Sequence, residues 1–460
     1  MGEITERAAV RRLQDRLGFG PRPGSVEAGF EATLGRLLNP AADTGLAPPP
    51  ALPQPVEKKK DKGKESKGKE GRGRAEPGTA ERGEGEPGKP DTEEARAARK
   101  AANKARAAQE VQLAVWWLDR MVAGERATER LTWFWHGHFA TSSQKVRSPQ
   151  FMLAQNQILR AHARGSFAEL AQRLITDAAM IRWLDGNDNR KGSPNENLAR
   201  EYFELFTLGI GNYTEIDVFE GARALTGWTV RRTSAQARFV PARHDSDPKT
   251  ILGQTGDFGA KEFVDLALAK PESAKFVIGR LWFRLVSPTP PSSATLARLV
   301  AAYGTKRDIE AVLRAIVVEP AFRDSASAMV KQPVEWAVGL MRALNVRPSG
   351  LNDKMKLRLL AGLRGMGQVP FRPPSVGGWP SGASWLTTSA GVTRLQLAQL
   401  LAKQAELGQL PKASARVDGV RALLGVDAWT DRTRNALAGL TDPAQLVAVA
   451  ACAPEYVVSG

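Results

Sequence analysis

Cysteine is almost absent from this sequence, which has a single one, Cys452, in 460 residues. One thiol cannot form an intramolecular disulfide, and it leaves no set of thiolates for a structural zinc site. No uninterrupted apolar run is long enough to cross a bilayer. Glu3 and Glu6 lie where a signal peptide would be basic, and no apolar stretch follows them. The sequence therefore predicts a cytoplasmic protein without a membrane span.

The familiar catalytic signatures are also missing. The chain has no GxSxG nucleophile motif, no Walker A loop and no strand–GxGxxG–helix unit. It has no HExxH and no EF-hand loop either. The glycines at 362–367 follow a predicted helix rather than a strand, so they indicate a helix end. Any active site must be assembled from residues that no short motif identifies.

Aliphatic and aromatic side chains other than alanine are absent from residues 57–110, which hold 16 Lys or Arg and 12 Asp or Glu. A segment with nothing to bury and mixed charges cannot fold alone. Together with the Pro-rich stretch at 48–55, it predicts a disordered, polyampholyte linker over 41–94. The whole chain has a net charge of +16, but the linker lacks aromatic residues to stack on bases, so nucleic acid is an unlikely partner.

The rest of the sequence shows helical periodicity with few alternating patterns. It predicts a mainly α protein: one large multi-helix domain with few or no short strands. Residues 1–40 are expected to form a helical pair, with Ser25 as the N-cap of its second helix, that docks on a main domain over 95–460. A small hairpin is predicted from 228–230 and 238–240. Further helices are predicted near 148–162, 166–178, 260–269, 271–285, 292–302, 307–317, 326–344, 353–363, 391–404, 415–424, 429–437 and 442–451.

Two helix starts have clear capping signals. Ser193, Pro194 and Glu196 have the spacing of an N-cap, a first-turn proline and a capping-box glutamate, predicting a helix to about 208. Thr214 and Asp217 open the next helix, which ends near 227.

The four histidines, His136, His138, His162 and His244, and one acidic helix are the candidates for chemistry. His136 and His138 flank Gly137, and His244 precedes Asp245 in a polar loop. Imidazole and carboxylate are ligands for zinc, manganese or iron. Glu196, Arg200 and Glu204 fall on one helical face, with Glu201 beside them; such residues serve as ligands or general bases, or they form i,i+4 ion pairs.

A loop rich in Trp, Gly and Pro at 371–385 contains Trp379 and Trp385. Aromatic loops can form a wall for a sugar or a peptide. The alternative is that the rings fill gaps where helices meet.

Several long motifs carry a family resemblance. They are LTWFWHGHFATS at 131–142, the run from NENLAREYF to ALTGW at 195–228, HDSDPKTILGQTG at 244–256, KQPVEW at 331–336 and PPSVGGWPSGASWLTTSA at 373–390. With RRLQDRLGFGP at 11–21 and APEYV near the end, the chain resembles the bacterial family called domain-of-unknown-function family 1800. The resemblance covers nearly the whole chain outside 41–94.

The resemblance implies a largely helical bacterial protein from a family without an established activity. Many members are exported, and their genes often neighbour those of a sulfatase-like family. It therefore implies export and a protein partner from a neighbouring gene. This chain departs from the family in its long charged insert and in showing no export signal.

Two hypotheses of different classes follow. The first is a metal-assisted hydrolase with a divalent metal in a polar pocket, in which Arg200 or Lys249 neutralises charge. Its predicted metal ligands are His136, His138, Glu196 and His244, and its predicted catalytic residues are Glu201, Arg200 and Asp245. The second is a non-catalytic binding or assembly protein that uses the Trp-rich loop at 371–385. Nucleic-acid association is a third alternative, resting only on a pI of about 10.0.

Overall fold

The structure is a computed structural model that describes residues 2–53, 92–231, 233–412 and 415–459. These residues contain 22 α-helices and six strands of two or three residues, which confirms the mainly α fold class. Residues 54–91, most of the predicted linker, lie outside the described part. Among the described helices, none is both long enough and apolar enough to span a membrane.

Two hydrophobic cores organise the helices. The first core is formed mainly by α3 (Glu93–Ala123), α5 (Ser143–Val146), α16 (Pro333–Ala343), α17 (Asp353–Gly365), α18 (Thr388–Ala402), α19 (Arg416–Leu423), α20 (Asp431–Ala438), α21 (Pro443–Ala450) and α22 (Pro454–Val457). The second is formed mainly by α1 (Glu6–Leu17), α2 (Phe30–Leu37), α7 (Phe167–Ile175), α9 (Asn197–Glu201), the π-helix η3 (Tyr202–Thr207), α10 (Glu215–Ala224), α11 (Ala260–Ala269), α12 (Pro271–Leu285), α13 (Ser293–Tyr303), α14 (Ile309–Val318) and α15 (Pro320–Arg323).

Three helices contribute to both cores: α4 (Thr128–His138), α6 (Pro149–Ala161) and α8 (Ala178–Trp183). On α4, Trp133 packs in the first core, whereas Phe134 and Trp135 pack in the second. A helix with aromatic residues all round is buried all round. The polar residues of α4 are therefore held in the interior of the protein, and this placement creates the site described below.

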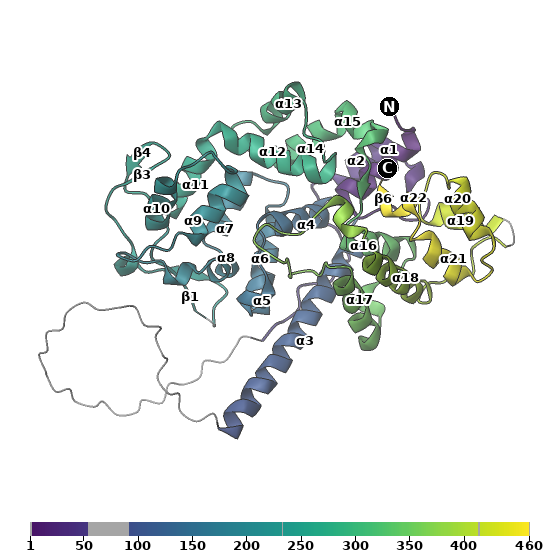
Figure 1. The fold of residues 1–460 in the computed structure, drawn as a ribbon, viewed down its shortest axis with the longest axis horizontal. Helices are drawn as coiled ribbons and strands as arrows, with labels where there is room; N and C mark the ends of the chain where they lie inside the picture. The colour runs from purple at the N-terminus through teal and green to yellow at the C-terminus, as the bar shows by residue number, and fades with distance from the viewer. Residues whose placement is uncertain (1, 54–91, 232, 413–414, 460) are drawn as a thin grey trace, which may run out of the picture.

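The N-terminal helices pack on each other and on distant parts of the chain. In α1, Arg12 donates to the carbonyl of Phe322 at 2.7 Å, and Arg16 donates to the carbonyl of Ser459 at 2.8 Å. The two ends of the chain consequently lie close together (Figure 1). The prediction of Ser25 as a helix N-cap was wrong: Ser25 begins the short η1 (Ser25–Glu27), and Gly29 precedes α2.

The chain before the undescribed segment lies along α3. Asp43 forms an ion pair with Arg126 at 2.7 Å. The carbonyl of Ala47 accepts hydrogen bonds from Trp116 at 3.2 Å and from Arg120 at 2.9 Å. The first half of α3 extends away from the body, as Figure 1 shows.

The strands form three small antiparallel pairs. The predicted hairpin is confirmed as β1 (Trp228–Val230) and β2 (Ala237–Phe239). Two further pairs were not predicted from the sequence: β3 (Lys249–Ile251) with β4 (Gln254–Gly256), and β5 (Met329–Val330) with β6 (Val458–Ser459). The helix predicted over 326–344 was therefore wrong at its start. Gln332 is extended before Pro333, as residues before proline prefer, and α16 begins at Pro333.

One of the two predicted helix starts is confirmed. Thr214 accepts from the backbone of Asp217 at 3.2 Å, and Asp217 accepts from the backbone of Thr214 at 2.8 Å. The other was wrong, because α9 begins only at Asn197 with Glu196 as its N-cap. The remaining short helical turns are η2 (Gly186–Asp188), η4 (Pro241–Arg243), η5 (Ser325–Ser327), η6 (Pro348–Gly350) and η7 (Gly382–Trp385).

The N-cap of α8 gives the fold a pH-dependent element. Asp177 is 4% exposed and accepts hydrogen bonds from Met180 N at 2.9 Å and Gln155 Nε2 at 2.8 Å. Burial outweighs these bonds and raises the pKa of Asp177 to about 7. The folded state then binds a proton that the unfolded state releases between about pH 4 and 7. This group's contribution to stability is present below pH 4 and is lost as the pH rises through 7.

Asp177→Asn should match the wild type near pH 4 and exceed its free energy of unfolding by about 4 kcal/mol near pH 8, since about three pKa units, at about 1.36 kcal/mol each, separate the folded and unfolded states. The variant keeps the capping oxygen but has no charge to bury. Denaturant unfolding at several pH values measures the difference. The exposed Asp188→Asn is the control, and the difference between this variant and the wild type should not change with pH. A difference that does not change with pH would contradict the assignment.

Candidate functional site

The two histidines of α4 lie in different environments. His136 is 1% exposed, and its ring contacts Trp117, Phe371 and Trp379 at centroid distances of 5.3, 5.4 and 5.5 Å. Its Nε2 has no hydrogen-bond partner among the described residues. Burial lowers the pKa of His136 to about 3, so the ring is neutral. His136 lies in the first core.

His138 faces the second core and has a defined tautomer. Its Nε2 lies 2.9 Å from the carbonyl oxygen of Phe206, near the end of the π-helix η3. Since a carbonyl only accepts, Nε2 must carry the hydrogen. Nδ1 is then an unprotonated acceptor, and it is buried without a partner among the described residues. Burial, with the nearby Arg280, lowers the pKa of His138 to about 3.

The predicted acidic helix forms ion pairs at the surface. Arg200 binds both carboxylate oxygens of Glu215 at 2.7 Å and one oxygen of Glu196 at 3.0 Å. The expected pairing of Arg200 with Glu204 was wrong, because the chain widens into the π-helix at Tyr202 and turns Glu204 away to accept from Tyr213 at 2.9 Å.

Glu201 is the remaining acidic candidate on this helix. It is half-buried, and burial together with the Glu204 carboxylate raises its pKa. A raised pKa is compatible with acid–base chemistry.

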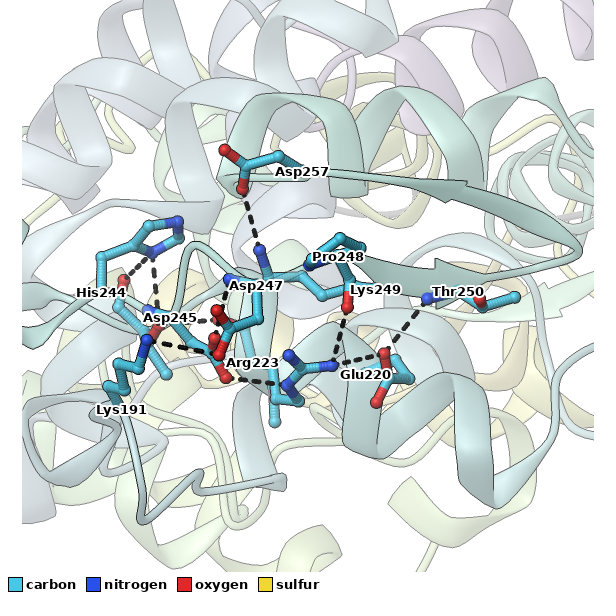
Figure 2. A network of polar contacts seen from close by, with 12 residues as sticks. Lys191, Glu220, Arg223, His244, Asp245, Asp247, Pro248, Lys249, Thr250 and Asp257 are labelled. Carbon is cyan, nitrogen blue, oxygen red and sulfur yellow. Dashed lines mark hydrogen bonds and ion pairs between the residues drawn. The ribbon is translucent and has the colours of Figure 1, made fainter.

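A second polar network surrounds the β3–β4 hairpin (Figure 2). Arg223 on α10 donates to Asp245 at 2.8 Å and to Glu220 at 2.7 Å. Its guanidinium lowers the pKa of Asp245. Lys249 is 1% exposed and forms an ion pair with Asp257 at 3.2 Å. These contacts fasten the hairpin and the loop before it to α10.

The tautomer of His244 is also defined. Its Nδ1 lies 3.0 Å from the carbonyl oxygen of Thr226 and 3.2 Å from the Thr226 hydroxyl. That hydroxyl already donates to the carbonyl of Arg223 at 2.7 Å. His244 Nδ1 is therefore the donor to the Thr226 carbonyl, and Nε2 is left as the acceptor.

The structure separates the predicted ligands. His136 lies in the first core, His138 in the second, Glu196 in a surface ion pair and His244 beside Thr226. Across the described ranges, no three His, Cys, Asp or Glu side chains are placed to hold one metal ion. The metal site and the catalytic roles of Glu201, Arg200 and Asp245 stay predictions.

The Trp-rich loop at 371–385 packs against α4. Trp379 is 4% exposed and stacks on Trp133 with ring centroids 4.7 Å apart. Trp385 is buried as well. The two rings fill the first core rather than forming an exposed wall.

Three neighbouring hollows lie beside α4. The outer groove, of about 560 Å³, has walls that include His138, Glu204, Glu272, Lys275, Phe276 and Arg280. The narrow passage, of about 20 Å³, has walls that include Arg130, His138, Arg280, Arg284, Gln332 and Trp379. The inner cavity, of about 140 Å³, has walls that include Asp15, Arg16, Arg130, Arg284, Lys331 and Glu335. Shared wall residues show that the passage lies between the other two.

Three arginines surround the passage, and they differ in their partners. Arg130 forms an ion pair with Glu335 at 2.8 Å. Arg284 donates to the carbonyl of Trp379 at 2.8 Å, and burial lowers its pKa to about 10. Arg280 has no hydrogen bond or ion pair with any described residue, and burial lowers its pKa. Among the described residues, the walls of the passage therefore contain three arginines and no carboxylate, and of the three only Arg130 has a carboxylate partner, Glu335.

The inner cavity also has an excess of positive charge, because its walls contain four cationic and two anionic side chains. Lys331 pairs with Asp15 at 3.0 Å. Arg16 is 3% exposed and donates to the carbonyls of Ser327 and Ser459 at 3.0 and 2.8 Å, while its Nη1 has no partner in the described part of the chain. Burial, with the repulsion of neighbouring Arg12, lowers the pKa of Arg16 to about 9.

Comparison with known proteins agrees with the motif resemblance. A family model described as "Protein of unknown function (DUF1800)" matches residues 12–458. The protein belongs to the DUF1800 family. No curated protein and no solved structure matches the chain.

Two of the DUF1800 motifs contain the cavity residues that the sequence analysis did not select. The motif at 11–21 supplies Asp15 and Arg16, and the motif at 331–336 supplies Lys331 and Glu335. Both motifs contain charged residues next to apolar ones, and this pattern could have identified these four residues from the sequence. Arg280 and Arg284 had no such signal, because they lie in an ordinary amphipathic helix pattern.

Proposed function

We propose that the protein binds a small molecule that carries an oxyanion. The oxyanion is held by Arg280 and Arg284, where the outer groove meets the passage. The rest of the ligand occupies the groove, whose volume of about 560 Å³ is that of a small-molecule site.

The observation that carries this proposal is the unpaired guanidinium of Arg280. Burying a charge without a counterion is costly, and native proteins pair such groups. Arg280 is half-buried, its Nε is buried without a partner among the described residues, and the side chain lines both the groove and the passage. A guanidinium offers a planar set of donors that matches a carboxylate or phosphate group. A bound oxyanion would supply the missing counterion.

The surrounding groups support the same ligand class. Arg284 repels Arg280 and sits beside it on α12, four residues later. Gln332 accepts from Gln368 at 2.6 Å through its Oε1, which leaves its amide nitrogen free to donate into the passage. The polar groups around the passage are thus mostly donors. The predicted metal-assisted hydrolase does not follow from this charge pattern and is kept only as a prediction.

Titration calorimetry with orthophosphate and with sulfate at low ionic strength tests the proposal. Arg280→Gln should weaken the binding of both anions about tenfold or more, the loss typical of a charged hydrogen bond. Lys275→Gln is the matched control, because it removes one positive charge from an exposed residue of the same helix and the same groove. It should change the affinity by about twofold or less. Equal losses in the two variants, or no binding to the wild type, would overturn the proposal.

A further inference from the structure

A second unpartnered group lies beside Arg280. His138 is 3% exposed and, like Arg280, lines both the outer groove and the passage. Its Nε2 hydrogen is committed to Phe206, so Nδ1 offers a lone pair and no hydrogen. Within the described residues, His138 on α4 is thus an acceptor without a partner, and Arg280 on α12 is a donor without a partner. Both residues lie in the walls of the outer groove and of the passage. A buried acceptor without a partner is costly and indicates a missing ligand group.

The other polar groups of these hollows do not substitute for His138. Arg130, Arg284 and Lys275 are donors. Gln332 offers its amide nitrogen because its oxygen accepts from Gln368, and Asn212 lies in the groove only. The carboxylates of Glu204 and Glu272 lie in the groove only, and Glu204 accepts from Tyr213 at 2.9 Å. In the passage, His138 lies among the guanidinium groups of Arg130, Arg280 and Arg284.

We infer that this site selects an oxyanion that still carries a hydrogen, which makes the ligand a hydrogen phosphate rather than a sulfate; orthophosphate has this form at neutral pH and a phosphate monoester has it below about pH 6. The inference rests on the proposed function. The phosphate hydroxyl donates to His138 Nδ1 while its charged oxygens accept from Arg280. Sulfate has no hydrogen at neutral pH, so one of its charged oxygens would face the lone pair of Nδ1. A site built to bond a hydroxyl rejects an analogue that lacks it.

Competitive titration with orthophosphate and sulfate near neutral pH measures the selectivity. The wild type should bind orthophosphate at least about tenfold more tightly than sulfate. His138→Gln places an amide nitrogen near the Nε2 position, so it keeps the bond to Phe206 and removes the acceptor. This variant should bind sulfate about as well as the wild type and lose the preference for phosphate.

The matched variant His138→Asn places its side-chain oxygen near the Nδ1 position and should retain part of the preference. A second measurement needs no variant. Methyl phosphate gains a hydrogen as the pH falls below about 6, whereas sulfate does not. The affinity of the wild type for methyl phosphate relative to sulfate should therefore rise severalfold from about pH 8 to about pH 5.5.

The outcomes separate the two proposals. Binding of both anions with equal affinity, lost in Arg280→Gln, would leave the oxyanion site in place and overturn the phosphate selectivity. A preference that persists in His138→Gln, or a methyl phosphate to sulfate ratio independent of pH, would also overturn it. Absence of binding by either anion would overturn both.

Discussion

Replacing Glu129 by Gln should lower the free energy of unfolding by about 3–5 kcal/mol. Glu129 is 2% exposed and lies in the first turn of α4. Arg120 on α3 donates to it at 2.8 Å, Arg160 on α6 donates at 2.7 and 3.0 Å, and Trp117 donates at 3.0 Å. One carboxylate thus joins three helices. Its loss leaves two guanidinium groups buried without a counterion.

The pH dependence of this variant has a definite sign. Burial alone would raise the pKa of Glu129, but Arg160 and Arg120 outweigh burial and lower it below the ordinary 4.5. A lowered folded-state pKa contributes stability above pH 4.5, and this contribution is lost as the pH falls through the folded value. The difference between wild type and Glu129→Gln should therefore be largest near neutral pH and shrink in acid.

Urea unfolding at neutral pH and in acid measures both effects. Glu215→Gln is the control, because Glu215 also pairs with an arginine at 2.7 Å but is largely exposed. Exposed ion pairs contribute little to stability, so this variant should unfold almost as the wild type does. A similar loss of unfolding free energy in the two variants would show that burial of the Glu129 network does not add to stability.

Local sequence signals predicted the helices more accurately than they predicted the tertiary contacts. Thr214 and Asp217 mark a helix start through contacts three residues apart, and the structure has that capping box. Ser193 has an equally good pattern, yet α9 begins later, because Ser193 instead forms a bridge with Arg190. The strand at Met329 could not be predicted locally, since its partner Ser459 lies at the other end of the chain.

The residues of the candidate site could likewise be predicted only in part from local sequence patterns. His138 was selected from sequence because imidazole is a common metal ligand, whereas its unpartnered Nδ1 is a feature of the structure. Arg280 was missed, since one arginine on an amphipathic helix predicts a solvated face. Its burial depends on how α12 lies against α4, and no periodicity encodes that arrangement.

Gly378→Ala should lower the free energy of unfolding by about 3 kcal/mol or more, from a left-handed backbone conformation and a steric clash. Gly378 has a φ of +82°, and an added Cβ would lie 2.2 Å from the carbonyl oxygen of Gly137 on α4. The Trp-rich loop must then move away from α4. Trp379 would lose its stacking on Trp133, and Arg284 would lose the Trp379 carbonyl that it binds.

This variant should therefore be both less stable and weaker in binding orthophosphate, because the loop that moves also positions Arg284 in the passage. Gly377→Ala is the matched control for the steric clash: its added Cβ would have Ser375 Oγ at 3.6 Å as the nearest atom, its backbone is not left-handed, and the residue lies in the wall of the outer groove. Thermal unfolding and phosphate titration of both variants measure the two effects. Reduced stability with unchanged phosphate affinity would show that the loop supports the fold without positioning the arginines. Reduced phosphate affinity in Gly378→Ala alone would show that the oxyanion site depends on the close approach of the loop to α4.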